Sequence, residues 1–119
     1  MPTILIVEDD ISLAELIKDR LENKGYKILV AYTGSESTKY IDEQKPDVIT
    51  LDIHLPDISG IEILKKLKKD KDKFSIPIII VTSDDTKQLE CEENKADAFV
   101  KKPIDFKKLE EIIRTVIKK

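Results

Sequence analysis

Residues 4–10 read Ile-Leu-Ile-Val-Glu-Asp-Asp, four apolar residues that lead directly into three acidic ones. A short continuous apolar run, rich in Ile and Val, is typical of a β-strand buried on both faces. Four further apolar runs follow along the chain: Lys27–Ala31, Val48–Leu51, 78–81 and 98–100. The pattern predicts a sheet that is covered on both sides.

Segments with helical periodicity separate the five runs. The first has apolar residues at helical spacing, begins after Asp10 as a plausible N-cap and stops at Gly25. These apolar residues are Ile11, Leu13, Leu16, Ile17 and Leu21. The stripe of the third segment is Ile61, Leu64 and Leu67, and that of the last, which Asp105 caps, is Leu109, Ile112, Ile113 and Val116.

The other two helical segments are weaker. Residues 35–44 form one of them. Residues 84–94 form the other, which is the poorest in apolar side chains, with only Leu89 and Cys91. We expect this fourth helix to be short and mobile, and Cys91 to be a partly buried small residue.

Strands that alternate with helices five times predict a parallel sheet between two layers of helices, an α/β fold of the (βα)5 type. Right-handed crossovers leave few ways to connect it. In open sheets of this kind, ligands bind beyond the carboxyl ends of the strands. The residues that follow each strand are therefore the candidates for a functional site.

The composition is that of a single acidic domain covering residues 1–119. Net charge is −3, from 21 basic and 24 acidic residues, which argues against direct nucleic-acid binding. The single cysteine cannot form an internal disulfide, and no apolar run is long enough to span a membrane. Because the N-terminus also lacks the features of a signal peptide, we expect a cytoplasmic protein.

Acidic side chains follow two of the predicted strands: Glu8 and Asp9 follow the first, and Asp52 follows the third. Two like charges about 4 Å apart repel by about 4 kcal/mol at an effective dielectric constant of about 20. A divalent cation such as Mg²⁺ removes this conflict, and Lys102 after the fifth strand supplies a further positive charge. With the hydroxyl of Thr82, these groups suit phosphoryl transfer to a carboxylate.

Four stretches carry a resemblance to a known family. They are residues 4–10 (ILIVEDD), 51–60 (LDIHLPDISG), 81–83 (VTS) and 99–103 (FVKKP). In this order and at these strand ends, they resemble the response-regulator receiver domain of two-component signalling, as in the chemotaxis receiver. The resemblance covers the whole chain. It implies a flavodoxin-like fold with a five-stranded parallel sheet of order 2-1-3-4-5.

The resemblance also implies roles for residues of the site. Asp52 corresponds to the phosphoacceptor and Lys102 to the ion-pair lysine of the family. Glu8 and Asp9 correspond to the acidic pair that holds Mg²⁺, Asp9 directly and Glu8 partly through water. Asp52 and the backbone carbonyl of His54 would complete the protein ligands of the metal.

A second group of positions corresponds to the switch of the family. Thr82 matches the hydroxyl that moves to the phosphoryl oxygen, and Phe99 the aromatic residue that swings inward with it. The Lys102–Pro103 bond would be cis. The implied phosphoryl donor is a sensor histidine kinase or a histidine phosphotransfer protein, and a further, unidentified protein would receive the signal.

The chain departs from the family pattern in three places. The stretch between Thr82 and Lys102 is about two residues shorter than usual, and Lys95 replaces a customary glycine. Ser83 stands where Ala is common. His54 and Asp84 flank the route of attacking water, where they could tune the lifetime of the phosphoryl group.

Three other functions compete with a phosphoryl-accepting receiver. A phosphatase of the haloacid-dehalogenase type needs an Asp two residues after the nucleophile, where this chain has His54. A flavodoxin needs a phosphate-binding loop after the first strand, and the acidic residues 8–10 would repel phosphate. A degenerate receiver that acts only as a scaffold is compatible with the sequence, although the intact acidic pair, acceptor and lysine count against it.

Overall fold

The computed structural model describes residues 1–117, which form a five-stranded parallel sheet between two layers of helices. The strand order is β2-β1-β3-β4-β5, which confirms the predicted flavodoxin-like order. The strands are β1 (Thr3–Val7), β2 (Lys27–Ala31), β3 (Val48–Leu51), β4 (Ile78–Thr82) and β5 (Ala98–Lys101). Each of the five predicted strands is present, with its ends moved by no more than one residue.

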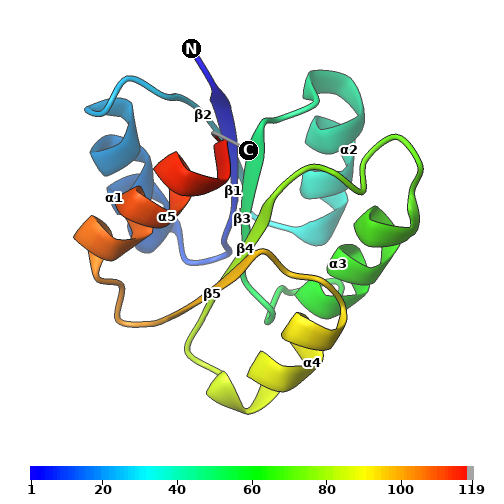
Figure 1. The fold of residues 1–119 in the computed structure, drawn as a ribbon. Helices are drawn as coiled ribbons and strands as arrows, with labels where there is room; N and C mark the ends of the chain where they lie inside the picture. The colour runs from blue at the N-terminus through cyan, green and yellow to red at the C-terminus, as the bar shows by residue number, and fades with distance from the viewer. Residues whose placement is uncertain (118–119) are drawn as a thin grey trace.

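Helices α1 (Ile11–Glu22) and α5 (Phe106–Ile117) cover one face of the sheet, as Figure 1 shows. The other face is covered by three helices: α2 (Gly34–Gln44), α3 (Gly60–Lys69) and α4 (Gln88–Glu93). A short 3-10 turn, Asp85–Lys87, precedes α4.

Two apolar clusters form the core, one on each face of the sheet. Leu5 and Val7 of β1 join the cluster under α2, α3 and α4, whereas Ile4 and Ile6 join the cluster under α1 and α5. Successive side chains of a strand point to opposite faces, so a strand covered on both sides needs apolar residues at every position. This explains the continuous apolar runs.

The predicted apolar stripe of α1 is only partly correct. The face that packs on the sheet consists of Ala14, Ile17 and Leu21. Ile11 is 64% exposed and Leu16 is 45% exposed. Successive residues of an α-helix are about 100° apart, so Leu16 points well away from the face formed by Ile17 and Leu21. Leu16 was therefore wrongly included in the predicted buried stripe. Asp10 caps α1, as expected, by accepting a hydrogen bond from the Leu13 N–H at 3.1 Å.

The fourth helix is short, as predicted, with six residues. Cys91 is its only buried residue and is completely buried, so the expectation of partial burial was wrong. The side chain belongs to the cluster under α2, α3 and α4, where it anchors α4 to the sheet. The mobility of α4 stays a prediction.

Helices α1 and α4 end in the same hydrogen-bonded motif, in which a residue with positive φ follows the last turn. At the end of α1 this residue is Gly25 (φ 93°), and at the end of α4 it is Lys95 (φ 71°). In α4 the Lys95 N–H donates to the Glu92 carbonyl and the Ala96 N–H to the Cys91 carbonyl, both at 3.0 Å. Lys95 therefore occupies a position where glycine is favoured, which agrees with the glycine that the resemblance implies there.

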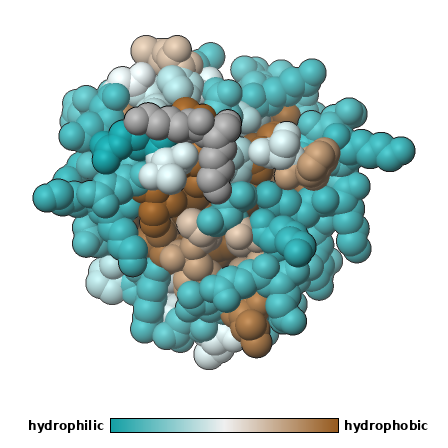
Figure 2. Space-filling model, viewed as in Figure 1, coloured by the Kyte–Doolittle hydropathy of each residue, from teal (hydrophilic) through white to brown (hydrophobic). Residues whose placement is uncertain are grey.

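Figure 2 shows a mostly hydrophilic surface, with apolar side chains gathered around β5 between α5 and α4. A shallow pocket at this edge is lined in part by Ala98, Ile112 and Val116. Within residues 1–117, no helix is both long enough and apolar enough to cross a membrane.

Candidate functional site

The carboxyl ends of β1 and β3 bring three carboxylates together. Glu8 and Asp9 follow β1, and Asp52 follows the neighbouring β3. Each contributes an oxygen atom to a group in which all the atoms lie within 4.8 Å of one another. Glu8 and Asp52 are buried, whereas Asp9 is exposed. This is the acidic cluster that the strand ends predicted.

Lys102 links two of these carboxylates from the end of β5. Its Nζ lies 2.7 Å from Glu8 Oε1 and 2.8 Å from Asp52 Oδ2. Only 18% of the lysine side chain is exposed, so solvent screens these contacts weakly. The bond between Lys102 and Pro103 is cis, as expected. The ion pair with Glu8 was not anticipated, because Glu8 had been assigned to the metal alone.

Burial and the ion pairs act in opposite directions on these groups. Burial raises the pKa of Glu8, and the hydrogen bond from Lys102 offsets this only in part. Burial also lowers the pKa of Lys102, but its hydrogen bonds to Asp52 and Glu8 prevail, and the pKa is raised overall. Lys102 therefore remains an ammonium group at neutral pH.

A tight loop after β3 holds Asp52 in place. The Asp52 N–H donates to the Val7 carbonyl at 3.1 Å, which continues the pairing of β3 with β1. At the far end of the loop, the Gly60 N–H donates to the Ile53 carbonyl at 2.7 Å. A Cβ on Gly60 would lie 2.1 Å from the Asp52 carbonyl oxygen. Gly60 is therefore needed for this close approach, because any side chain would collide with the Asp52 carbonyl.

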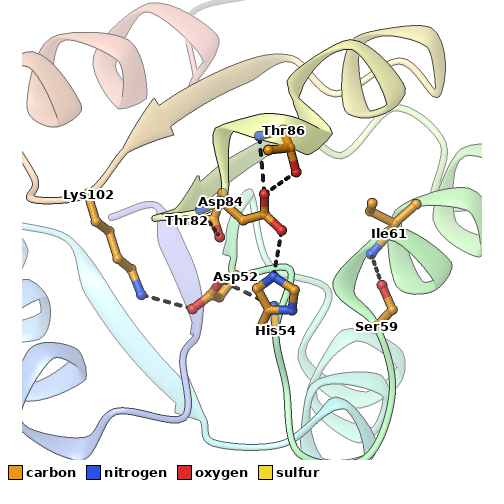
Figure 3. Close-up of polar contacts among 8 residues, drawn as sticks. All are labelled: Asp52, His54, Ser59, Ile61, Thr82, Asp84, Thr86 and Lys102. Carbon is orange, nitrogen blue, oxygen red and sulfur yellow. Dashed lines mark hydrogen bonds and ion pairs between the residues drawn. The ribbon is translucent and has the colours of Figure 1, made fainter.

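The side chains of His54 and Asp84 form a bridge beside Asp52 (Figure 3). His54 Nε2 lies 2.8 Å from Asp84 Oδ2, and 65% of the histidine side chain is exposed. Figure 3 shows the imidazole ring beside Asp52, with Lys102 approaching Asp52 from the opposite side. The His54 N–H also donates to Asp52 Oδ1 at 3.3 Å.

Asp84 connects this bridge to Thr82, whose side chain is completely buried. The Asp84 N–H donates to Thr82 Oγ1 at 3.3 Å (Figure 3). The Asp84 carboxylate also accepts hydrogen bonds from the backbone and the hydroxyl of Thr86. The hydrogen bond from the Thr86 hydroxyl, followed by the one from His54, lowers the pKa of Asp84.

Phe99 lies on β5, where its backbone pairs with Ile80 of β4. Its half-buried side chain packs against the apolar cluster under α2, α3 and α4. The structure thus places Phe99 on the same side of the sheet as Cys91 and the fourth helix, one strand away from Thr82.

The donor set of the cluster fits a hard divalent cation. Glu8, Asp9 and Asp52 offer carboxylate oxygens, and Mg²⁺ is bound in proteins by one or two carboxylates together with water. The exposure of Asp9 leaves room for such water molecules. Among residues 1–117, no histidine nitrogen or thiol joins the three carboxylates of this group, so the group does not offer the nitrogen and sulfur ligands that zinc prefers.

Comparison with known proteins gives the family. The family described as the response regulator receiver domain matches residues 4–114. The chain therefore belongs to the response regulator receiver family.

Relatives of two kinds share this domain. The chain is 35% identical over 119 residues to the phosphate regulon transcriptional regulatory protein PhoB of Pseudomonas aeruginosa, covering 98% of this chain and 52% of PhoB. It is 33% identical over 117 residues to the polar-differentiation response regulator DivK of Brucella ovis, covering 97% of this chain and 95% of DivK. The chain spans about half the length of the first relatives that it matches.

Solved structures agree with the fold. A putative response regulator from Chloroflexus aurantiacus superposes with a TM-score of 0.94 at 27% identity, covering 99% of this chain and 98% of the other. A CheY-like receiver domain protein from Methanospirillum hungatei superposes with a TM-score of 0.92 at 30% identity, covering 99% of this chain and 94% of the other. The receiver domain of the P. aeruginosa sensor kinase PA1611, which has a magnesium ion in its active-site cleft, gives 0.90 at 22% identity, covering 99% and 98%.

Proposed function

We propose that this domain accepts a phosphoryl group on Asp52 and passes the resulting change of state to a protein partner. The ammonium group of Lys102, 2.8 Å from a carboxylate that belongs to an acidic cluster, is the observation that carries the proposal. A nucleophilic carboxylate that lies beside a fixed cation and a metal-binding cluster has what phosphoryl transfer requires.

Glu8, Asp9, Asp52 and the backbone carbonyl of His54 would hold Mg²⁺. The bound ion would neutralise charge on the oxygen atoms of the transferred group. Lys102 would also neutralise such charge, because its Nζ lies 2.8 Å from Asp52 Oδ2. The third carboxylate, Glu8, would also position the lysine through their 2.7 Å contact.

The transfer itself needs little from the protein beyond this arrangement. A carboxylate oxygen of Asp52 attacks the phosphorus of a phosphohistidine, the new O–P bond forms as the N–P bond breaks, and the imidazole leaves. The donor would be a sensor histidine kinase or a histidine phosphotransfer protein. The domain would later hydrolyse its own acyl phosphate, so it acts as a signalling module and only marginally as an enzyme.

The switch would work through Thr82. In the structure its hydroxyl accepts a hydrogen bond from the Asp84 N–H. In the phosphorylated state it would instead donate to a phosphoryl oxygen, and a charge-assisted bond of this kind is worth about 1.5–3 kcal/mol. Such a bias shifts a two-state equilibrium about ten- to a hundredfold. Phe99 would move inward with Thr82 and change the surface around β5 that a partner reads.

The single cysteine, Cys91, is buried and free, which fits a reducing compartment. We therefore propose that the phosphoryl transfer takes place in the cytoplasm.

The first experiment is the intact mass of the protein after incubation with Mg²⁺ and acetyl phosphate. We expect wild type to gain one phosphoryl group and Asp52→Asn to gain none. Asp10→Asn is the matched control, because Asp10 is the next acidic residue along the chain but caps α1. It should be phosphorylated like wild type, since Asn also caps helices.

Removal of Mg²⁺ with a chelator should abolish the gain in mass of the wild-type protein. A folded wild-type protein that gains no phosphoryl group with Mg²⁺ present would contradict the proposal and favour a degenerate scaffold. A gain in Asp52→Asn equal to that of wild type would place the acceptor elsewhere.

A further inference from the structure

We propose that Asp57 is a positioning residue for the metal site, because it clamps the loop after β3 onto the N-terminus of α2. The inference rests on the proposed function, since it concerns the carbonyl of His54 that would bind Mg²⁺. It adds to that function a link between α2 and the site, made by a residue that is not one of the three carboxylates of the acidic cluster.

The clamp is a pair of hydrogen bonds to one carboxylate. Asp57 Oδ1 accepts from the Gly34 N–H at 2.8 Å, and Oδ2 accepts from the Ser35 N–H at 2.9 Å. These bonds, that from Gly34 first, lower the pKa of Asp57. The carboxylate is therefore charged at neutral pH, and its charge faces the positive end of the α2 dipole.

Helix α2 has a cap of its own, so Asp57 does more than begin the helix. Thr33 is the N-cap, and its Oγ1 accepts from the Glu36 N–H at 3.1 Å. A helix leaves its first N–H groups without intrahelical partners, and Asp57 satisfies two of them from a different part of the chain. The hydrogen-bond acceptor for these two N–H groups, the Asp57 carboxylate, therefore belongs to the loop that also carries His54.

Close packing reinforces the clamp. A Cβ on Gly34 would lie 2.0 Å from Cγ2 of Ile58 and 3.2 Å from Asp57 Oδ1. The loop is thus pressed against the start of α2 at the one residue that has no side chain.

Fixing Asp57 also restricts the position of His54, because hydrogen bonds close the loop between them at its base. His54 and Ser59 form an isolated antiparallel bridge, and the Gly60 N–H donates to the Ile53 carbonyl at 2.7 Å. Asp57 lies at the tip of this closed loop, and His54 lies at its base. Residues that orient metal ligands from outside the coordination sphere change metal affinity by about 10- to 100-fold.

The test measures Mg²⁺ affinity by isothermal titration calorimetry, using the whole chain in four forms: wild type, Asp57→Ala, Asp57→Asn and Thr33→Ala. We expect Asp57→Ala to weaken Mg²⁺ binding about tenfold. Asp57→Asn should weaken it less, because the amide keeps one acceptor oxygen. Thr33→Ala removes a hydrogen bond from the same helix end, so it should lower thermal stability while leaving Mg²⁺ affinity unchanged.

The concentration of Mg²⁺ at which acetyl phosphate labelling is half-maximal should rise by the same factor in Asp57→Ala. Equal Mg²⁺ affinity in wild type and both Asp57 variants would overturn the inference and leave the proposed function intact. Equal weakening by Thr33→Ala would also overturn it, since stability of α2 would then be the cause. A folded wild type that binds no Mg²⁺ would overturn both.

Discussion

Helices α3 and α4 follow neighbouring strands of the sheet, but they are anchored very differently. Helix α3 has ten residues, five of them buried, and Ser59 caps it. Helix α4 has six residues, one of them buried, and no side-chain hydrogen bond caps it. The strand that precedes the proposed acceptor, Asp52, thus leads into a firmly packed helix, whereas the strand that ends with Thr82 leads into a weakly packed one.

This difference matters for a switch. The proposed metal ligands need a fixed geometry, which the firmly packed helix α3 helps to supply. A change at Thr82 needs a neighbour that moves at little cost in free energy, and segments with few buried contacts open most readily. We therefore expect changes to α3 to affect the whole domain and changes to α4 to remain local.

The largest expected effect comes from a matched pair of Leu→Ala substitutions. Leu64 of α3 is completely buried, and Leu64→Ala should cost about 3 kcal/mol of unfolding free energy through loss of burial and formation of a cavity. Leu89 of α4 is 68% exposed, and Leu89→Ala should change stability by about 0.5 kcal/mol at most. Urea unfolding measures both, and similar losses in the two variants would contradict the comparison.

A smaller effect is expected from Cys91→Ser, which places a hydroxyl where α4 has its only buried side chain. The substitution should cost about 1–2 kcal/mol, because the new hydroxyl loses its bonds to water. Hydrogen exchange should show faster opening in the amides of α4 than in those of α3, and labelling by acetyl phosphate should be retained. If α3 opens to the same extent, α4 is not a separate weak unit.

Lys95→Gly should stabilise the domain by about 1 kcal/mol, since a left-handed conformation is costly for any residue with a Cβ. Gly25→Ala is the reciprocal change in the same motif at the end of α1, and it should destabilise by about 1 kcal/mol. The melting temperatures of the two variants, compared with wild type, show whether each substitution raises or lowers stability. A loss of stability in Lys95→Gly would mean that the lysine side chain stabilises α4 in some other way.

The smallest expected effect concerns pH at the end of α3. A hydrogen bond from the Asp72 N–H, together with the charge of Lys73, lowers the pKa of Asp70 below its ordinary value of 3.8. The unfolded state then binds this proton more readily, so the stabilisation is present above pH 3.8 and disappears as the pH falls through the folded-state pKa.

Asp70→Asn should therefore lower the melting temperature slightly at pH 7, and the difference from wild type should shrink as the pH falls below 3.8. Thermal unfolding followed over this range measures it. A difference that is independent of pH would show that the charge of Asp70 does not contribute.

The sequence alone predicted the strands, the alternation of strands with helices and the edge of the sheet where the site lies. These features depend on periodicity along the chain, which is local information. A parallel arrangement then brings the residues after β1, β3 and β5 to one edge, so the sequence also predicted that Glu8, Asp9, Asp52 and Lys102 are neighbours. The helix caps Asp10 and Asp105 could also be predicted from the sequence, because a cap residue bonds within the first turn of its own helix.

Only the tertiary structure decided which contacts these residues make. Lys102 bridges Glu8 and Asp52, Asp57 reaches back 23 residues to Gly34, and Cys91 is fully buried. Each of these facts depends on the distance and angle between elements that are remote in the chain, which local periodicity does not specify. The same applies to Gly60, whose missing side chain is explained by the Asp52 carbonyl that packs against it.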